Sequence, residues 1–295
     1  MNRRKADAAL AVNALIWGAT FTVVKAALRD ISPLLFLALR FTLATVALSA
    51  VFLAGWRRMA PPHSAGRAPV YGGVLPGVLL FAGFLLQTLG LQLTTPPKSA
   101  FLTGLTSVMV PLLAALVYKT KPQASEVLGV LVATAGLGLM TQEGPLASIS
   151  LASIGRGDLL TVLCAVAFAG HIVTLGHYSE KMRFETLSVM QLGTAAVLAL
   201  SLFWWAEPVH VEWRPAVIGA VVGTGLLATA LTFTVQAWAQ RYTTSTRTAL
   251  IYTLEPVFAW LISYWALGEG LAGRTAAGAA LILAGVIVVE LRPWS

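Results

Sequence analysis

The sequence has little charge and almost no cysteine. Charged residues make up 11% of the 295 residues, against about 25% in a soluble domain, whereas hydrophobic residues make up 57%. This composition, with a mean hydropathy of +0.79, excludes a soluble globular domain, because so much apolar surface cannot remain in contact with water. The one cysteine, Cys164, lies in an apolar segment, which excludes a disulfide framework and a cysteine-ligated metal cluster.

The chain also lacks the motifs of soluble enzymes. It has no Walker sequence, no nucleophile elbow and no His-Glu-x-x-His pair. His171 and His177 are six residues apart and lie on different faces of a helix, so a two-histidine metal site is not expected. We expect neither a metal nor a cofactor. The net charge of +8 comes from basic residues in twos and threes between apolar runs, which indicates topology signals and no nucleic-acid partner.

Apolar segments long enough to cross a membrane occupy most of the chain. A spanning helix needs about 20 mostly apolar residues. Ten segments meet this requirement, at 8–28, 33–55, 70–93, 98–118, 125–141, 157–177, 184–206, 215–240, 246–267 and 273–291. The connections leave no room for a soluble catalytic domain, so the sequence predicts an all-α integral membrane protein with ten transmembrane helices.

The distribution of Lys and Arg predicts the orientation of these helices. With the N-terminus in the cytoplasm, thirteen basic residues fall in cytoplasmic connections and six in outer ones. Because cytoplasmic connections of membrane proteins are enriched in Lys and Arg, we expect both termini in the cytoplasm and a location in the cell inner membrane. The short basic N-terminus has no clear cleavage site, so the first apolar run is interpreted as a span.

The two halves of the chain resemble each other. A shift of 151 residues aligns Ala14–Thr20 with Ala165–His171 and Arg40 with Gln191, and a shift of 145 aligns Thr106–Leu112 with Ile251–Val257. The last helix of each half also carries glycines seven residues apart, a pattern that favours close helix packing. Five helices per half is an odd number, so the second half is expected to enter the membrane inverted. The predicted repeats cover 1–143 and 157–295, with a linker over 144–156.

Several short motifs occur in an order that resembles one family of transporters. They are Trp17-Gly18, Arg40-Phe41, Pro111, the run Leu254-Glu255-Pro256-Val257-Phe258-Ala259, and Leu267-Gly268-Glu269. The chain resembles the drug/metabolite transporter superfamily, and more narrowly its bacterial ten-helix branch with two EamA domains. The resemblance implies a 5+5 inverted repeat that exports small metabolites, often amino acids, with helices 1, 3, 4, 6, 8 and 9 around a central cavity. The first half departs from the second where Met109-Val110 precede the proline in place of Leu254-Glu255.

The candidate cavity residues are polar or aromatic side chains in the helices that the resemblance places at the centre. They are Asn13, Trp17, Thr20, Phe81, Phe84, Gln87, His171, Gln236, Tyr252 and Glu255. Asn13, Trp17 and Thr20 share one face of the first span. Amides and hydroxyls between aromatic rings suit a ligand with both polar and apolar parts. The alternative is that the same side chains are polar and aromatic contacts between packed helices.

Glu255 and Arg40 are the one acid and the one base well inside the apolar segments. A charge there is costly, which makes both residues functional candidates. Glu255 would bind a proton or the ammonium group of a substrate. The alternative, a structural polar group satisfied within the bundle, is favoured because helix 9 offers no second acid or basic partner. For Arg40, seven residues inside Pro33, anchoring or structural pairing is favoured.

Two prolines predict interruptions of the helices that carry them. Proline lacks the backbone N–H and its ring disturbs the preceding turn, so Pro111 and Pro256 are expected to break the fourth and ninth spans. Backbone carbonyls freed at such breaks are tolerated in a membrane only where protein or water covers them.

These observations predict an inner-membrane exporter that works by alternating access through a central cavity. The expected cargo is amino acids, with aromatic ones suggested by the aromatic lining, or similar small metabolites. A carrier of drugs, nucleosides or sugars is the alternative within transport. An intramembrane enzyme would have only Glu255, His171 and Arg40 as catalytic groups, and a receptor would not need two similar halves. The expected partners are the small-molecule substrate and membrane lipid, while a coupling ion and a homodimer stay open.

Overall fold

The computed structural model describes residues 3–56, 70–93, 96–119, 123–141, 155–267 and 273–290. Within these ranges the chain is helical apart from short connections, and the one β-type contact is an isolated antiparallel bridge between Ile31 and Val211. The predicted all-α fold is confirmed. Of the predicted linker over 144–156, only the last two residues fall in the described ranges, and Gly268 and Glu269 fall outside them.

The helices follow the predicted spans closely. In chain order they are α1 (Arg3–Ala27), α2 (Pro33–Trp56), α3 (Tyr71–Leu93), α4 (Pro96–Gly104), α5 (Thr106–Tyr118), α6 (Ala124–Thr141), α7 (Arg156–Ser179), α8 (Phe184–Ala206), α9 (Pro215–Gly225), the π-helix η3 (Leu226–Leu231), α10 (Thr232–Ala239), α11 (Ser245–Tyr252), α12 (Glu255–Leu267) and α13 (Gly273–Glu290). Three predicted spans are interrupted: the fourth is α4 and α5, the eighth is α9, η3 and α10, and the ninth is α11 and α12.

Most of these segments are long and apolar enough to cross a membrane. Among the described residues, seven stretches combine sufficient length and hydropathy; one of them runs through the break between α4 and α5, and another runs through the π-helix η3. Two further apolar helices, Ala124–Leu139 and Gly273–Val289, are shorter. The remaining segment is the divided ninth one. Length and composition therefore agree with a multi-pass membrane protein.

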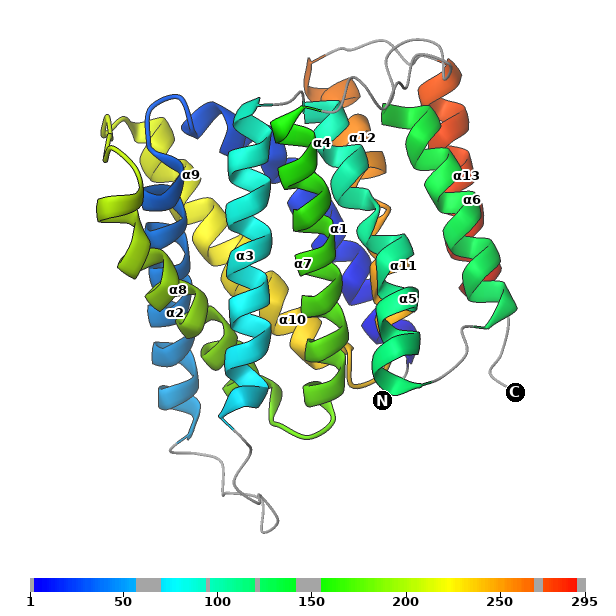
Figure 1. Ribbon diagram of the computed structural model, residues 1–295, viewed down its shortest axis with the longest axis horizontal. Helices are drawn as coiled ribbons and strands as arrows, with labels where there is room; N and C mark the ends of the chain where they lie inside the picture. Colours follow the sequence, from blue (N-terminus) through cyan, green and yellow to red (C-terminus); the bar gives the residue numbers. More distant parts are fainter. Residues whose placement is uncertain are drawn as a thin grey trace.

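The bundle has two ends, which the direction of the helices defines. The helix α1 begins and α13 ends at the same end, the lower one in Figure 1, which we call the termini end; the opposite one is the far end. From the termini end α1 runs to the far end, whereas α7, its counterpart in the second half, runs the other way (Figure 1). The helices between them alternate in direction, as spans joined by short connections must.

The ninth segment breaks directly before its proline. Pro256 has no N–H to donate to the carbonyl of Tyr252, four residues earlier. The last turn of α11 instead has hydrogen bonds that span three residues. The N–H of Thr253 donates to Leu250 O at 3.1 Å, and the N–H of Leu254 donates to Ile251 O at 3.0 Å. The next helix, α12, then begins at Glu255, so this carboxylate stands at a helix N-terminus inside the bundle.

The fourth segment does not break at Pro111, as the sequence suggested. Pro111 lies inside α5, and the interruption is at Leu105. Hydroxyl groups determine this position, because the side chain of Thr106 donates to Thr103 O at 2.7 Å and that of Ser107 donates to Gly104 O at 2.9 Å. These carbonyls are thus satisfied without backbone donors, which allows the turn. One proline removes a single ladder bond, which α5 tolerates.

Contacts between the halves build the bundle. The helix α3 packs along α7 and α8, α2 packs along α8, and α1 packs against the eighth and ninth segments. At the side of the bundle α6 packs along α13, and the glycines spaced seven residues apart in each helix lie at this contact (Figure 1). A Cβ at Gly136 would lie 2.5 Å from the carbonyl oxygen of Gly278, and one at Gly285 would lie 2.6 Å from that of Gly129. Only glycine permits this approach of the two backbones.

Candidate functional site

A π-helical turn in the eighth segment forms one side of the candidate site. In η3 the hydroxyl of Thr229 donates to Thr224 O at 2.8 Å, and the carbonyl of Ala228 is left free for donors from other helices. Two such donors meet there: Nε1 of Trp17 at 2.9 Å and Nη2 of Arg40 at 3.0 Å. Single π turns within helices are frequent at functional sites, so this turn is included in the candidate site.

Arg40 is fixed by this turn. Its side chain is 4% exposed, and its Nε donates to the hydroxyl of Thr229. The guanidinium carbon lies 4.5 Å from the ring centroid of Phe84, a cation–π geometry. Arg40 therefore does not extend to the membrane surface, and in the described part of the chain it makes no ion pair with an acid. Its contacts support the structural role that the sequence favoured.

Aromatic rings fill the centre of the bundle around Phe84. Its ring centroid lies 5.5 Å from Phe41, 5.3 Å from Phe168 and 5.9 Å from Phe233, all in edge-on geometries. These contacts join α3 to α2, α7 and α10, and Phe81, one turn before Phe84, is buried in the same core. Edge-on aromatic pairs contribute stability in addition to that of their buried area, so this cluster holds the four helices firmly together.

Trp17 and Tyr252 form a further part of the candidate site, next to Phe233 of the aromatic cluster. Their ring centroids are 4.7 Å apart, and Trp17 also lies 5.5 Å from Phe233. The buried Asn13, one turn before Trp17, donates from Nδ2 to Thr232 O at 2.8 Å and contacts the Tyr252 hydroxyl at 3.4 Å. Trp17 and Tyr252 keep part of their surface exposed. Asn13 and Trp17, which share one face of α1, thus both contact Tyr252.

His171 is enclosed, in contrast to the prediction that it lines an open cavity with Trp17 and Tyr252. It is 1% exposed, because its Nε2 lies 2.8 Å from Oε1 of Gln191 and its ring lies 5.6 Å from Phe233. Helical periodicity identified the inward face of α7 correctly, but it does not show which neighbours cover that face. Gln191, noted in the sequence only as the counterpart of Arg40, is one of them.

The candidate amides and hydroxyls serve mainly as contacts within and between helices. Gln236 donates to Gln240 Oε1 at 3.1 Å, and Gln240 donates to Ile172 O at 2.9 Å, which ties α10 to α7. Thr20 donates to Trp17 O within α1 at 3.0 Å. Gln87 is partly exposed and reaches Thr103 Oγ1 at 3.5 Å, a long contact. Of this group, Gln87 remains the most accessible amide.

Glu255 has no such partner. It is partly exposed, and no other described residue makes a hydrogen bond or an ion pair with its carboxylate. Its position at the start of α12 is favourable for negative charge. The sequence-based preference for a satisfied structural carboxylate therefore has no support in these contacts.

Close approach of α1 holds this end of α12 in place. A Cβ added to Gly18 would lie 2.7 Å from the carbonyl oxygen of Glu255 and 2.9 Å from the N of Ala259. The glycine of the Trp17-Gly18 motif thus lets α1 contact the backbone at the helix break. Trp17, Tyr252 and Glu255 consequently occupy one region, with Phe233 behind Trp17.

One buried ion pair was missed by the sequence analysis. Asp7 and Arg247 were counted as parts of the flanking connections, yet they are 8% and 4% exposed and form a 3.2 Å ion pair. The only signal in the sequence is a lone acid among the basic residues of the N-terminus. Its partner, 240 positions away, cannot be recognised from local pattern.

A helical bundle of this kind, with interrupted segments and an unpaired acid near the breaks, has the architecture of a secondary transporter. The chain belongs to the EamA-like transporter family, whose sequence pattern matches it twice, over residues 4–142 and 155–291. The family and the relatives named below are transporters, which sets aside the alternative of an intramembrane enzyme.

Individual relatives agree with this assignment along the whole chain. An uncharacterized transporter of Archaeoglobus fulgidus is 34% identical over 293 residues, which cover 99% of this chain and 88% of the relative. The uncharacterized transporter YyaM of Bacillus subtilis is 27% identical, over 92% of this chain and 89% of the relative. A solved crystal structure at 22% identity superposes with a TM-score of 0.78 over 97% of this chain and 98% of that one, and shows the same fold.

Proposed function

We propose that the protein exports amino acids, with aromatic ones preferred, by alternating access through the region around Trp17, Tyr252 and Glu255. The observation that carries the proposal is Glu255, a residue that is only partly buried and whose carboxylate no described residue pairs. An unpaired charge inside a membrane protein is costly and marks a substrate or ion site. A substrate ammonium group would neutralise it during transport.

The neighbouring rings account for the apolar part of such a substrate. Trp17 and Tyr252 stand 4.7 Å apart beside Glu255, and both are partly exposed. Aromatic faces attract cations and pack against other rings. An ammonium group next to an aromatic side chain therefore fits this region better than a sugar, which offers neither feature.

Alternating access is supported by the relation between the two halves. The helix α1 contacts the eighth and ninth segments, while α7, its counterpart, contacts α3 and the fourth segment, so equivalent pairs occur in both directions. The opposite directions of α1 and α7 agree with an inverted repeat (Figure 1). In such a repeat, a rocking motion of one half against the other opens each end in turn.

Transport in proteoliposomes tests the substrate. Purified protein should exchange a labelled aromatic amino acid, and unlabelled compounds should compete if they keep the ammonium group and the ring. An analogue without the amine should not compete. Exchange of nucleosides or sugars without exchange of amino acids would instead support the alternative carrier and contradict the proposal.

Orientation is proposed from the charge bias of thirteen to six basic residues. The termini end is the cytoplasmic end of the bundle in the cell inner membrane. A reporter that is active only in the cytoplasm, fused after Ser295, should give signal. Signal from a periplasmic reporter at the same position would contradict this orientation, and with it the direction of export.

A further inference from the structure

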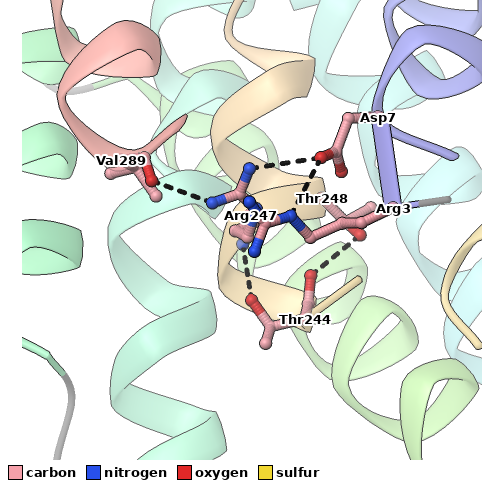
Figure 2. Close-up of polar contacts among 6 residues, drawn as sticks. All are labelled: Arg3, Asp7, Thr244, Arg247, Thr248 and Val289. Carbon is pink, nitrogen blue, oxygen red and sulfur yellow. Dashed lines mark hydrogen bonds and ion pairs between the residues drawn. The ribbon is translucent and has the colours of Figure 1, made fainter. Parts of the chain in front are cut away.

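The buried ion pair at the termini end joins the two halves of the protein. Arg247, at the start of α11, extends one Nη atom to Asp7 of α1 at 3.2 Å and the other to the carbonyl oxygen of Val289, near the end of α13, at 2.8 Å (Figure 2). Arg3 lies one turn before Asp7 and contacts it at 3.8 Å. One guanidinium thus connects the first helix of the chain to the last two segments.

The helix α11 is densely packed at this end. Every residue from Ser245 to Ile251 is buried, because α11 is surrounded by α1, α5, α6, α7 and α13. An apolar cluster that includes Leu10, Ile251 and Leu254 lies between the ion pair and the candidate site. The ion pair and this cluster together separate Glu255 from the termini end.

The other half of the ninth segment is less enclosed. Beyond the break, α12 packs against α1 and, less extensively, α6. Glu255, Phe258 and Trp260 all retain exposed surface. Among the residues whose burial is described, the ninth segment is therefore fully buried over 245–251 and mostly only partly buried over 255–262. This asymmetry is what one state of an alternating-access cycle requires.

We propose that Asp7 and Arg247 form a latch that holds the termini end shut and that must separate when this end opens. The proposal rests on the alternating-access function given above. A buried ion pair is stable only while both partners stay together, whereas separated charges need water. Opening the end would admit that water and would separate α1 from α11 and α13. The pair is thus a two-state element, favoured when dry and closed and released when hydrated and open.

Thiol labelling from each side of the membrane tests the latch. In a Cys164→Ala background, Ile251→Cys places a reporter thiol one turn beyond Arg247, in the buried part of α11. A membrane-impermeant maleimide is applied from the termini side or the far side to vesicles of defined orientation. The closed protein should label slowly from the termini side.

Separating the pair should open that side selectively. Because minor conformations are typically populated at roughly 0.1–10%, Asp7→Asn or Arg247→Gln should raise the labelling rate from the termini side by about tenfold or more. Labelling from the far side should not rise. Asp7→Glu, which keeps the charge, should label as slowly as the parent. The matched control is Asp30→Asn, which removes an exposed ion pair with Arg214 at the far end and should have no effect on labelling.

Every outcome of the labelling experiment either supports or contradicts the latch. Unchanged labelling after Asp7→Asn and Arg247→Gln would overturn the latch. Labelling that rises equally from both sides would show that the pair only stabilises the fold, and would overturn it as well. The measurement needs no substrate, so it is independent of the cargo. Failure of the parent protein to exchange amino acids would count against the proposed function alone.

Discussion

Trp17 and Arg40 donate hydrogen bonds to the same oxygen, the carbonyl of Ala228 in the π turn of the eighth segment. One donor comes from α1 and the other from α2, both in the first half of the chain, whereas the acceptor is in the second half. A carbonyl that a π turn leaves without a backbone hydrogen bond is energetically costly in a membrane interior unless another donor binds it. The two side chains therefore hold the eighth segment against the first half at the candidate site.

Unequal effects are expected when these two donors are removed. Trp17→Phe keeps the ring contacts and leaves Arg40 on Ala228, so it should lower the free energy of unfolding by about 0.5–1.5 kcal/mol. Arg40→Gln loses the charged hydrogen bonds and the contact with Phe84, so a loss of about 1.5–3 kcal/mol is expected. Denaturation of the purified protein in detergent measures both. A larger effect of Trp17→Phe than of Arg40→Gln would contradict the shared-acceptor geometry.

Glu255→Gln should impair transport and spare the fold. No described contact depends on the charge of this side chain, so thermal stability should stay close to that of the parent. Exchange of an aromatic amino acid should fall by about tenfold or more, the equivalent of about 1.4 kcal/mol of lost substrate interaction. Glu185→Gln, at the partly buried pair with Arg183 outside the candidate site, is the control and should leave exchange unchanged.

The same variant separates substrate binding from proton coupling. If Glu255 carries a coupling proton, the amide abolishes accumulation driven by a pH gradient but preserves exchange. If Glu255 binds the ammonium group, exchange itself falls. Normal exchange and normal gradient-driven accumulation together would show that the carboxylate has neither role.

Accessibility of single cysteines should follow the burial seen in this state. In the Cys164→Ala background, Tyr252→Cys should react with a small polar thiol reagent, because Tyr252 is partly exposed beside Glu255. His171→Cys should react far more slowly, since Gln191 and Phe233 cover that position. The ratio of labelling rates, measured from the far side, tests the arrangement. Equal rates at the two positions would restore the open cavity around His171 that the sequence suggested.

The positions of several helices could be predicted from the sequence, because they depend on a single physical rule. A backbone in lipid must satisfy its own hydrogen bonds, so apolar runs of sufficient length can only be helices. This rule predicted the boundaries of α2 and α8 almost to the residue. The glycine spacing in α6 and α13 likewise predicted that each helix packs closely against a neighbour, but it did not predict that the two pack against each other.

Features that depend on distant partners were not predictable. The break at Leu105 is determined by the hydroxyls of Thr106 and Ser107, which compete with the effect of Pro111. The π turn around Ala228 has no sequence signature, and its donors are about 200 positions away in the chain. The pairing of Asp7 with Arg247 is of the same kind. Such contacts follow from the packed bundle and from no local pattern.

Gly18 lies at the contact between α1 and the break in the ninth segment. In Gly18→Ala the new methyl group would overlap with the backbone carbonyl of Glu255, which is 2.7 Å from the ideal Cβ position. The helices must move apart, and insertion into packed structure usually costs about 1–3 kcal/mol. Because the displaced backbone carries Glu255, exchange should fall together with stability.

Gly219→Ala is the matched control for this change. Nothing lies within 4 Å of the ideal Cβ position at Gly219, in α9, so the added methyl meets no neighbour. Alanine should leave exchange unchanged, and it should stabilise the helix slightly, by about 0.5–1 kcal/mol, because glycine is the poorer helix former. Equal behaviour of the two variants in both stability and exchange would mean that α1 does not touch the break at Glu255. The candidate site would then lose the contact that holds its carboxylate in place.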